Sequence, residues 1–97
     1  MNDFYETVNE HLETLELYVP VVARVHGEAH PEFHDVKKVY DDMSPLLKSQ
    51  GEEKPDLDNA FSRLREITDN YSVPDDVCES YEAVYQMLEA IDNKYSK

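Results

Sequence analysis

The sequence has no tryptophan, one cysteine and only two glycines among its 97 residues. A single cysteine excludes an internal disulfide, and so few glycines leave no glycine-rich loop to hold a phosphate. The first ten residues, MNDFYETVNE, have neither a basic start nor an apolar run, so we expect no signal peptide. No stretch approaches the roughly 20 apolar residues that a membrane-spanning helix needs. These absences predict a cytoplasmic protein that does not enter a membrane.

Basic residues are also scarce. Nine lysines and arginines stand against 22 aspartates and glutamates, which gives a net charge of −13. Binding to nucleic acid or to an anionic membrane surface requires lysine and arginine, so we expect neither as a partner. A carboxylate-rich protein that imitates DNA would be an exception, but acidic, solvated helix faces are the ordinary explanation for such a composition.

Apolar residues recur every three or four positions along four segments, which is the period of an amphipathic helix. We predict one domain, residues 1–97, with helices over residues 3–26, 31–49, 56–71 and 74–96. The last helix has the most regular apolar seam, formed by Val77, Tyr81, Val84, Leu88, Ile91 and Tyr95. Because no run alternates with a period of two, no sheet is expected. Four such helices with short connections predict an all-α, antiparallel up-down four-helix bundle.

The local signals place the ends of these helices. Gly27 is expected to end the first helix in a left-handed conformation, and Pro31 to occupy the first turn of the second. Asp56 is the expected N-cap of the third helix. Pro20 is expected to bend the first helix, and Pro45 to kink or end the second.

Three of the four histidines lie in VARVHGEAHPEFHDV, residues 22–36, each four positions from the next. On one helix, His26, His30 and His34 would face the same way and suit a metal. Gly27 and Pro31 instead separate them into a helix end, a connection and a new helix start. No aspartate or glutamate stands three or four positions from any histidine. The local Glu and His pairs of a di-iron bundle are therefore missing.

A zinc site remains the open alternative from these residues. It would take His26 with His30 or His34, completed by Cys78 or by a carboxylate such as Glu32. Cys78 itself is expected in the first turn of the last helix, as a small, partly buried residue and not a nucleophile. We expect no catalytic residue and no cofactor, with iron or zinc as the alternative.

Two stretches resemble the hemerythrin-like iron–sulfur cluster repair proteins: YVPVVARVHGEAHPEFHDVKKVYDDM and LREITDNYSVPDDVCESYEAVYQMLEAI. The resemblance extends over residues 12–51 and 56–95, in the order found in that family. It implies a four-helix bundle that holds a non-haem di-iron centre. It also implies a role in restoring iron–sulfur clusters after oxidative or nitrosative stress.

Carried over by position, the family's early histidine pair falls on Phe4 and Tyr5, and its later ligands fall on or near Gln50, Glu53 and Lys54 or beyond the last residue. We therefore expect a shortened member without the metal ligands. The family signature that it keeps lies in the first turn and consists of His26, Gly27, His30, Pro31 and Glu32. The predicted function is non-catalytic contact with a protein, either a second copy or a full-length repair protein. The alternative is an iron- or zinc-binding cluster repair protein.

Overall fold

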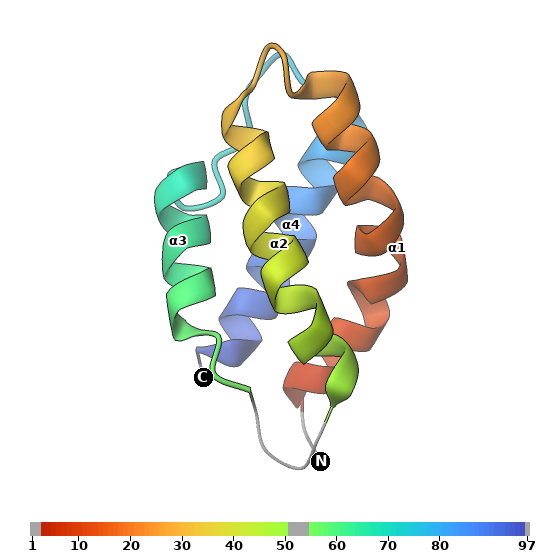
Figure 1. Cartoon of the computed structure of the whole chain (residues 1–97), viewed down its shortest axis with the longest axis vertical. Coiled ribbons are helices and arrows are strands. Elements are labelled where there is room, and N and C mark those ends of the chain that lie inside the picture. Colours follow the sequence, from red (N-terminus) through yellow and green to blue (C-terminus); the bar gives the residue numbers. More distant parts are fainter. Residues whose placement is uncertain (1–2, 51–54, 97) are drawn as a thin grey trace.

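The computed structural model describes residues 3–50 and 55–96. They form four helices, α1 (Asp3–His26), α2 (Glu32–Ser49), α3 (Asp58–Thr68) and α4 (Glu79–Tyr95). The helices run alternately up and down, so that α1 begins and α4 ends at the same end of the molecule (Figure 1). The described residues contain no strand. The predicted all-α, antiparallel up-down four-helix bundle is confirmed.

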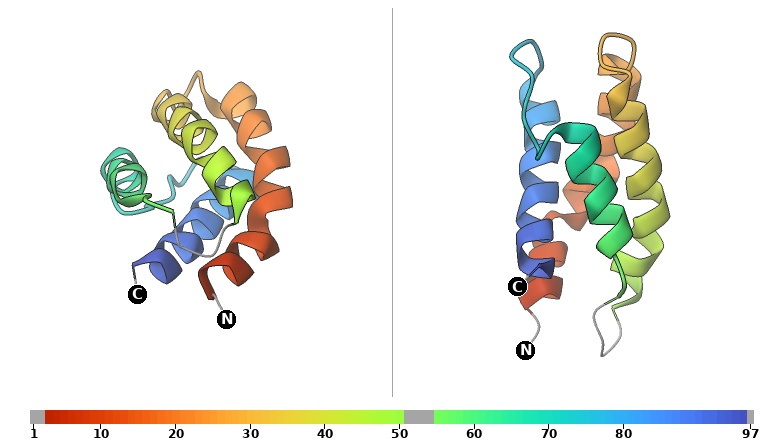
Figure 2. Two further views of the ribbon diagram at one scale, coloured as in Figure 1. Left: turned by 60° about the horizontal axis from the view of Figure 1, so that its bottom comes forward. Right: turned by 90° about the vertical axis from the view of Figure 1, so that its left-hand side faces the viewer.

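Helix α1 packs against both α4 and α2, and α2 packs against both α1 and α3. Figure 2 shows this arrangement end-on and from the side of α3. At 11 residues, α3 is the shortest of the four helices. Its upper end therefore lies well below the start of α2, and a loop covers the remaining height (Figures 1 and 2). None of the helices formed by the described residues has both the length and the apolar character needed to cross a membrane.

The periodic apolar residues form the core, as their spacing predicts. In α4, the side chains of the predicted seam are buried from Tyr81 to Tyr95, whereas Val77 precedes the helix and packs on the core from the loop. Removal of this apolar surface from water is the main force that holds the bundle together. Tyrosine hydroxyls bond between helices or from the α3–α4 turn to α4: Tyr40 donates to Glu16, Tyr71 to Asp92 and Tyr81 to Glu32, whereas the Tyr85 hydroxyl contacts that of Tyr81 within α4.

Two polar groups tie neighbouring helices together. Glu16 of α1 accepts hydrogen bonds from the Tyr40 hydroxyl at 2.6 Å and from the Ser44 hydroxyl at 3.1 Å, both on α2. Lys48 adds an ion pair to the same carboxylate. The hydrogen bond from Lys48, followed by that from Tyr40, lowers the pKa of Glu16. At the other side of the bundle, Asp92 of α4 binds Arg65 of α3.

The boundaries of α3 and α4 differ from the predictions. Helix α3 ends at Thr68 and not at residue 71, because Asp69, Asn70 and Tyr71 have left-handed backbones with φ of 53°, 60° and 62°. Helix α4 begins at Glu79 and not at residue 74, so Pro74 lies in a loop. Three consecutive left-handed residues turn the chain away from the helix, and the partly buried Val73 and Val77 then hold the loop on the core.

The remaining helix signals are partly confirmed. Asp56 does not cap α3: Leu57 holds that position, and the Asp56 carboxylate accepts only a long, 3.4 Å hydrogen bond from the Asp58 N–H. Pro31 stands one residue before α2. Pro20 and Pro45 both lie inside helices, so Pro45 does not end α2.

Candidate functional site

The histidine-containing turn between α1 and α2 meets the loop between α3 and α4 at one end of the bundle. The three histidines are separated as predicted: His26 ends α1, His30 lies in the connection, and His34 is in the first turn of α2. They do not share a helical face. The fourth, His11, is partly buried on α1, with Nε2 3.9 Å from the Glu10 carboxylate.

Gly27 shapes this turn for a reason that differs from the prediction. Its backbone is not left-handed, and its N–H continues the helical bonding to the Ala23 carbonyl at 3.0 Å. A Cβ at this position would collide with that carbonyl oxygen and with the imidazole of His34. Glycine is therefore required by the close approach of α2 to the end of α1, and the His34 ring is held against its backbone.

His30 joins the two segments. Its Nδ1 lies 3.2 Å from Oε2 of Glu32, and its Nε2 lies 3.0 Å from Oδ1 of Asp76 in the α3–α4 loop. Only 15% of the His30 side chain is exposed. Each ring nitrogen thus lies within hydrogen-bond distance of a carboxylate oxygen, so the imidazole links the turn to the α3–α4 loop. The sequence predicts Asp76 in the first turn of a helix, and the late start of α4 makes it a loop residue that reaches His30.

His26 contacts the only cysteine of the chain. The Nε2 atom of His26 lies 3.1 Å from Sγ of Cys78, which occupies the N-cap position of α4. The predicted first-turn, partly buried position of Cys78 is wrong, since this residue is exposed. The loop that delays α4 leaves the thiol at the helix entrance, and the pairing of His26 with Cys78 is one of those considered for zinc.

Two tyrosines of α4 support this group from below. The Tyr81 ring lies 5.6 Å from the centres of both the His26 and the His30 rings. Its hydroxyl donates to Oε2 of Glu32 at 3.3 Å and contacts the Tyr85 hydroxyl at 2.9 Å. Burial, followed by the bond to Tyr85, raises the pKa of Tyr81. The sequence indicated these tyrosines only as core residues, because the spacing of apolar residues does not show where a tyrosine hydroxyl lies.

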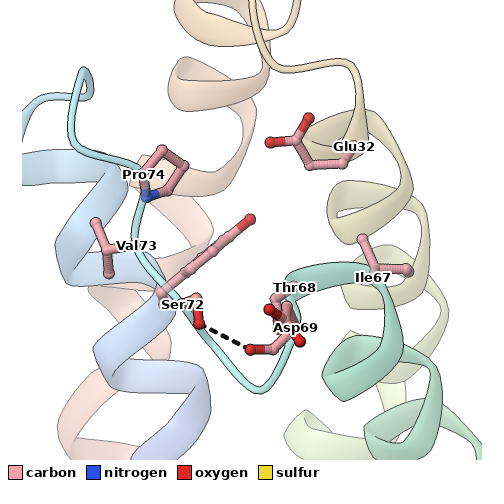
Figure 3. Close-up of a pocket in the computed structure, with 8 residues that line it drawn as sticks. Glu32, Ile67, Thr68, Asp69, Ser72, Val73 and Pro74 are labelled. Atoms are coloured by element: carbon pink, nitrogen blue, oxygen red, sulfur yellow. Dashed lines mark hydrogen bonds between the residues drawn. The ribbon is translucent and has the colours of Figure 1, made fainter.

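A pocket of about 430 Å³ opens beside this network, between the start of α2, the end of α3 and the following loop. Figure 3 shows the Glu32 carboxylate on one side of the pocket, directed towards the side where Val73 and Pro74 lie, with Thr68 and Asp69 below it. Its lining residues are Glu32, Ile67, Thr68, Asp69, Ser72, Val73, Pro74 and Tyr85. Apart from Glu32, no residue of this pocket was predicted as a site residue.

The described residues do not fit the di-iron centre that the family resemblance implies. Among them, no three histidine, cysteine or carboxylate side chains converge in a way that would hold a metal ion. The buried polar or charged side chains of the interior are Ser44, Thr68 and Asp92, and Asp92 is already bound to Arg65. Tyr5 and Phe4 are both buried in the core, whereas Glu53 and Lys54 lie outside the described residues.

The outer side of α1 carries an apolar strip, formed by Leu17, Val21 and Val25. Their exposed fractions are 63%, 36% and 62%. Residues four positions apart lie above one another on a helix, so these three side chains make a continuous line. Leu46 on α2 is a further exposed apolar side chain, at 42%.

The chain is similar to curated iron–sulfur cluster repair proteins called ScdA. The protein from Staphylococcus epidermidis is 25% identical over 122 aligned residues, which cover 94% of this chain and 54% of the relative. The protein from Staphylococcus haemolyticus is 23% identical over 116 residues, covering 88% and 52%. The chain thus spans about half the length of the curated relatives it matches. No family model and no solved structure matches it. The resemblance inferred from the two sequence stretches is confirmed.

Proposed function

We propose that this relative of the iron–sulfur cluster repair proteins acts by contact with another protein and not as an enzyme. The partner is a second copy of the chain or a full-length repair protein of the ScdA kind, and the setting is the cytoplasm. The contact surface is the apolar strip of α1. The proposal keeps the link with cluster repair through the partner, and assigns no redox or metal chemistry to this chain.

The apolar strip is the observation that carries this proposal. Leu17 and Val25 each leave more than half of their accessible surface in water, at 63% and 62%. A partner that covered this surface would stabilise the complex by about 25 cal/mol for each Å² of apolar surface removed from water. A line of exposed aliphatic side chains on one helix, bordered by charged residues, is a common form of protein contact surface.

The strip is tested by substituting Leu17→Ser together with Val25→Ser. Both side chains are exposed, so the bundle should fold as before. Leu46→Ser is the matched control, because it removes an exposed leucine from α2. We expect the double variant to lose association with the partner, and the control to keep it. Equal binding by the double variant and the unchanged protein would overturn the role of the strip.

The two possible partners are distinguished by two separate binding measurements. Light scattering on the isolated chain reports self-association, and calorimetry with full-length ScdA from Staphylococcus epidermidis reports binding to a relative. Association in one of the two experiments identifies the partner. A chain that is monomeric at about 100 μM and gives no heat with ScdA would contradict the proposal, since apolar contact surfaces act well within that range.

The second candidate is a metal-binding role in cluster repair under oxidative or nitrosative stress. It is favoured by the contact of His26 Nε2 with Cys78 Sγ at 3.1 Å, because imidazole and thiolate are the ligands that zinc prefers. His30, Glu32 and His34 lie in the same turn as further donors. The pair supplies two of the four ligands of a tetrahedral zinc site. Because no third such side chain of the described residues converges on the pair, two of these residues would have to move towards it to complete the site.

Metal content decides between the two candidates. Protein purified without an affinity tag would carry about one equivalent of zinc, or up to two of iron, if the second candidate holds. Both His26→Ala and Cys78→Ser should then lose the metal, whereas His11→Ala should keep it. Below about a tenth of an equivalent of any transition metal, the second candidate is eliminated.

A further inference from the structure

The pocket between α2, α3 and the α3–α4 loop has no part in the proposed protein contact. Its polar side chains offer hydrogen-bond acceptors to a ligand and no free hydroxyl donor. It exists because α3 stops at Thr68 while α2 begins higher up at Glu32 (Figure 3). Its volume of about 430 Å³ lies within the range of small-molecule sites. Three of the residues that line it are apolar, namely Ile67, Val73 and Pro74.

The two aliphatic hydroxyls of the pocket have already used their hydrogens. The Thr68 hydroxyl donates to the Leu64 carbonyl at 2.7 Å. The Ser72 hydroxyl donates to the Asp69 carbonyl at 2.8 Å, the bond drawn in Figure 3. A hydroxyl has one hydrogen to donate, so neither residue has a donor left for a ligand.

The tyrosine pair is oriented by Glu32. An ionised carboxylate only accepts hydrogen bonds, so the Tyr81 hydroxyl donates to Oε2 of Glu32 at 3.3 Å. The hydrogen between the two tyrosines must then come from Tyr85, whose hydroxyl lies 2.9 Å from that of Tyr81. The Tyr85 oxygen is therefore left as an acceptor, and Tyr85 is one of the residues that line the pocket.

Two N–H groups at the end of α3 and in the loop are already bound to backbone carbonyls. The N–H of Ser72 is bound to the Thr68 carbonyl at 3.0 Å, and the N–H of Asp69 is bound to the Arg65 carbonyl. Pro74 has no N–H. The bonds to Glu32 among the described residues reach Oε2, from His30 and from Tyr81. Oε1 of Glu32, the Tyr85 oxygen and the Asp69 carboxylate thus remain as acceptors.

We propose that this pocket binds an organic cation, an alkylguanidinium or an alkylammonium group. Such a group is the complement of the site, because it carries several N–H donors and no acceptor. The guanidinium or ammonium would lie between Glu32 and the Asp69 carboxylate, and its alkyl chain against Val73 and Pro74. The net charge of −13 attracts cations to the whole molecule, and the pocket selects where one stays.

The first experiment compares two ligands of the same shape. Butylguanidinium and butylurea differ in one N–H-bearing group, which is an oxygen acceptor in the urea. Each is titrated into the full, ¹⁵N-labelled chain, followed by the amide resonances of Ser72 and Val73. We expect saturable shifts at millimolar butylguanidinium and none with butylurea. Equal binding of the two, or shifts scattered over all four helices, would overturn the proposal.

Variants of equal charge then locate the cation. Glu32→Gln should weaken butylguanidinium binding by about tenfold, since it removes the charge-assisted bonds. Asp69→Asn, at an exposed position with a left-handed backbone that asparagine tolerates, should weaken it severalfold without disturbing the tyrosine pair. Asp42→Asn on the exposed side of α2 is the control and should change binding less than twofold. If Asp42→Asn costs as much as Glu32→Gln and Asp69→Asn, binding is non-specific attraction and the proposal fails.

The source of the cation is identified by a third ligand. An arginine within a capped tripeptide, acetyl-Gly-Arg-Gly-amide, presents the same guanidinium as part of a protein chain. Tighter binding of the tripeptide than of butylguanidinium, with the same shifts at Ser72 and Val73, supports the site and indicates an arginine of a partner protein. Tighter binding of butylguanidinium supports it and indicates a free cation. A failure of both ligands to bind overturns it.

Discussion

The guanidinium of Arg65 and the carboxylate of Asp92 form a two-pronged ion pair between α3 and α4, with Nε 2.8 Å from Oδ2 and Nη2 2.8 Å from Oδ1. The same carboxylate accepts the Tyr71 hydroxyl at 2.8 Å and the Ser96 hydroxyl at 3.2 Å. Asp92 is only 4% exposed, so four donors converge on one buried charge. This cluster fixes the end of α3 and the left-handed turn that follows it.

Loss of that charge should destabilise the bundle. We expect Asp92→Asn to lower the free energy of unfolding by about 2–3 kcal/mol, because charge-assisted hydrogen bonds are replaced by weaker ones and one amide hydrogen faces a donor. Urea denaturation measures the change. The control is Glu89→Gln, an exposed residue of the same helix, which should stay within about 0.5 kcal/mol. A loss below about 1 kcal/mol for Asp92→Asn would show that the cluster contributes little.

Acid should unfold the protein through two carboxyls. Burial would raise the pKa of Asp92, but the bonds from Arg65 and Tyr71 outweigh it and hold that pKa below its ordinary value. The pKa of Glu16 is also lowered, first by Lys48 and then by Tyr40. A lowered pKa adds stability above the unfolded value of about 4, and this stability is lost as the pH falls through the folded value.

The check on this acid dependence is the free energy of unfolding measured from about pH 6 to about pH 2, where it should fall steadily below about pH 4. Asp92→Asn should flatten the fall. An unchanged slope in that variant would mean that other groups dominate.

Alkali should unfold the protein through its tyrosines. Burial raises the pKa of Tyr40, Tyr71, Tyr81 and Tyr85 above that of a free phenol, which is about 10. A raised pKa leaves the stability intact below about pH 10, and the stability is lost as the pH rises towards the folded value. Tyrosinate absorbance should therefore increase together with the loss of helical circular dichroism. Titration of all seven tyrosines near pH 10 in a folded chain would contradict this.

Gly27→Ala should destabilise the turn between α1 and α2. The new methyl group would collide with the Ala23 carbonyl oxygen and displace the His34 ring, so we expect a loss of about 1–3 kcal/mol. The exposed neighbour Glu28→Ala serves as the control in the same denaturation experiment. A Gly27→Ala variant as stable as the unchanged chain would show that the imidazole of His34 and the turn move aside freely.

The fold could be predicted where one periodic signal extends without interruption. The range of α1 agrees with the prediction at both ends, and that of α2 differs by one residue. Pro20 stands inside α1 and Pro45 inside α2, because the buried apolar face continues on either side of each proline. The end of α3 could not be predicted in the same way, since Tyr71 continues its apolar period. Tyr71 instead lies in a left-handed turn, from which its hydroxyl reaches Asp92.

The candidate site was predictable in its parts but not in its assembly. Gly27 and Pro31 correctly indicated that the histidines would be separated. The partners of His30 and His26 were not predictable as a set, because Asp76 and Cys78 come from a loop that the sequence indicated as helix. The pocket beside Glu32 follows from the same loop. Its acceptor character depends on the direction of a tyrosine hydrogen bond, which leaves no trace in the spacing of residues.

The most direct test of the proposed protein contact is light scattering on the isolated chain at about 1–100 μM and at two salt concentrations. Each copy carries a charge of −13, so salt should strengthen an apolar association by screening the repulsion. We predict a mass above that of the 11.3 kDa monomer, growing with salt, and a return to the monomer in the Leu17→Ser, Val25→Ser variant but not in Leu46→Ser. A monomer under every condition would exclude self-association and, if full-length ScdA also fails to bind, would contradict the account.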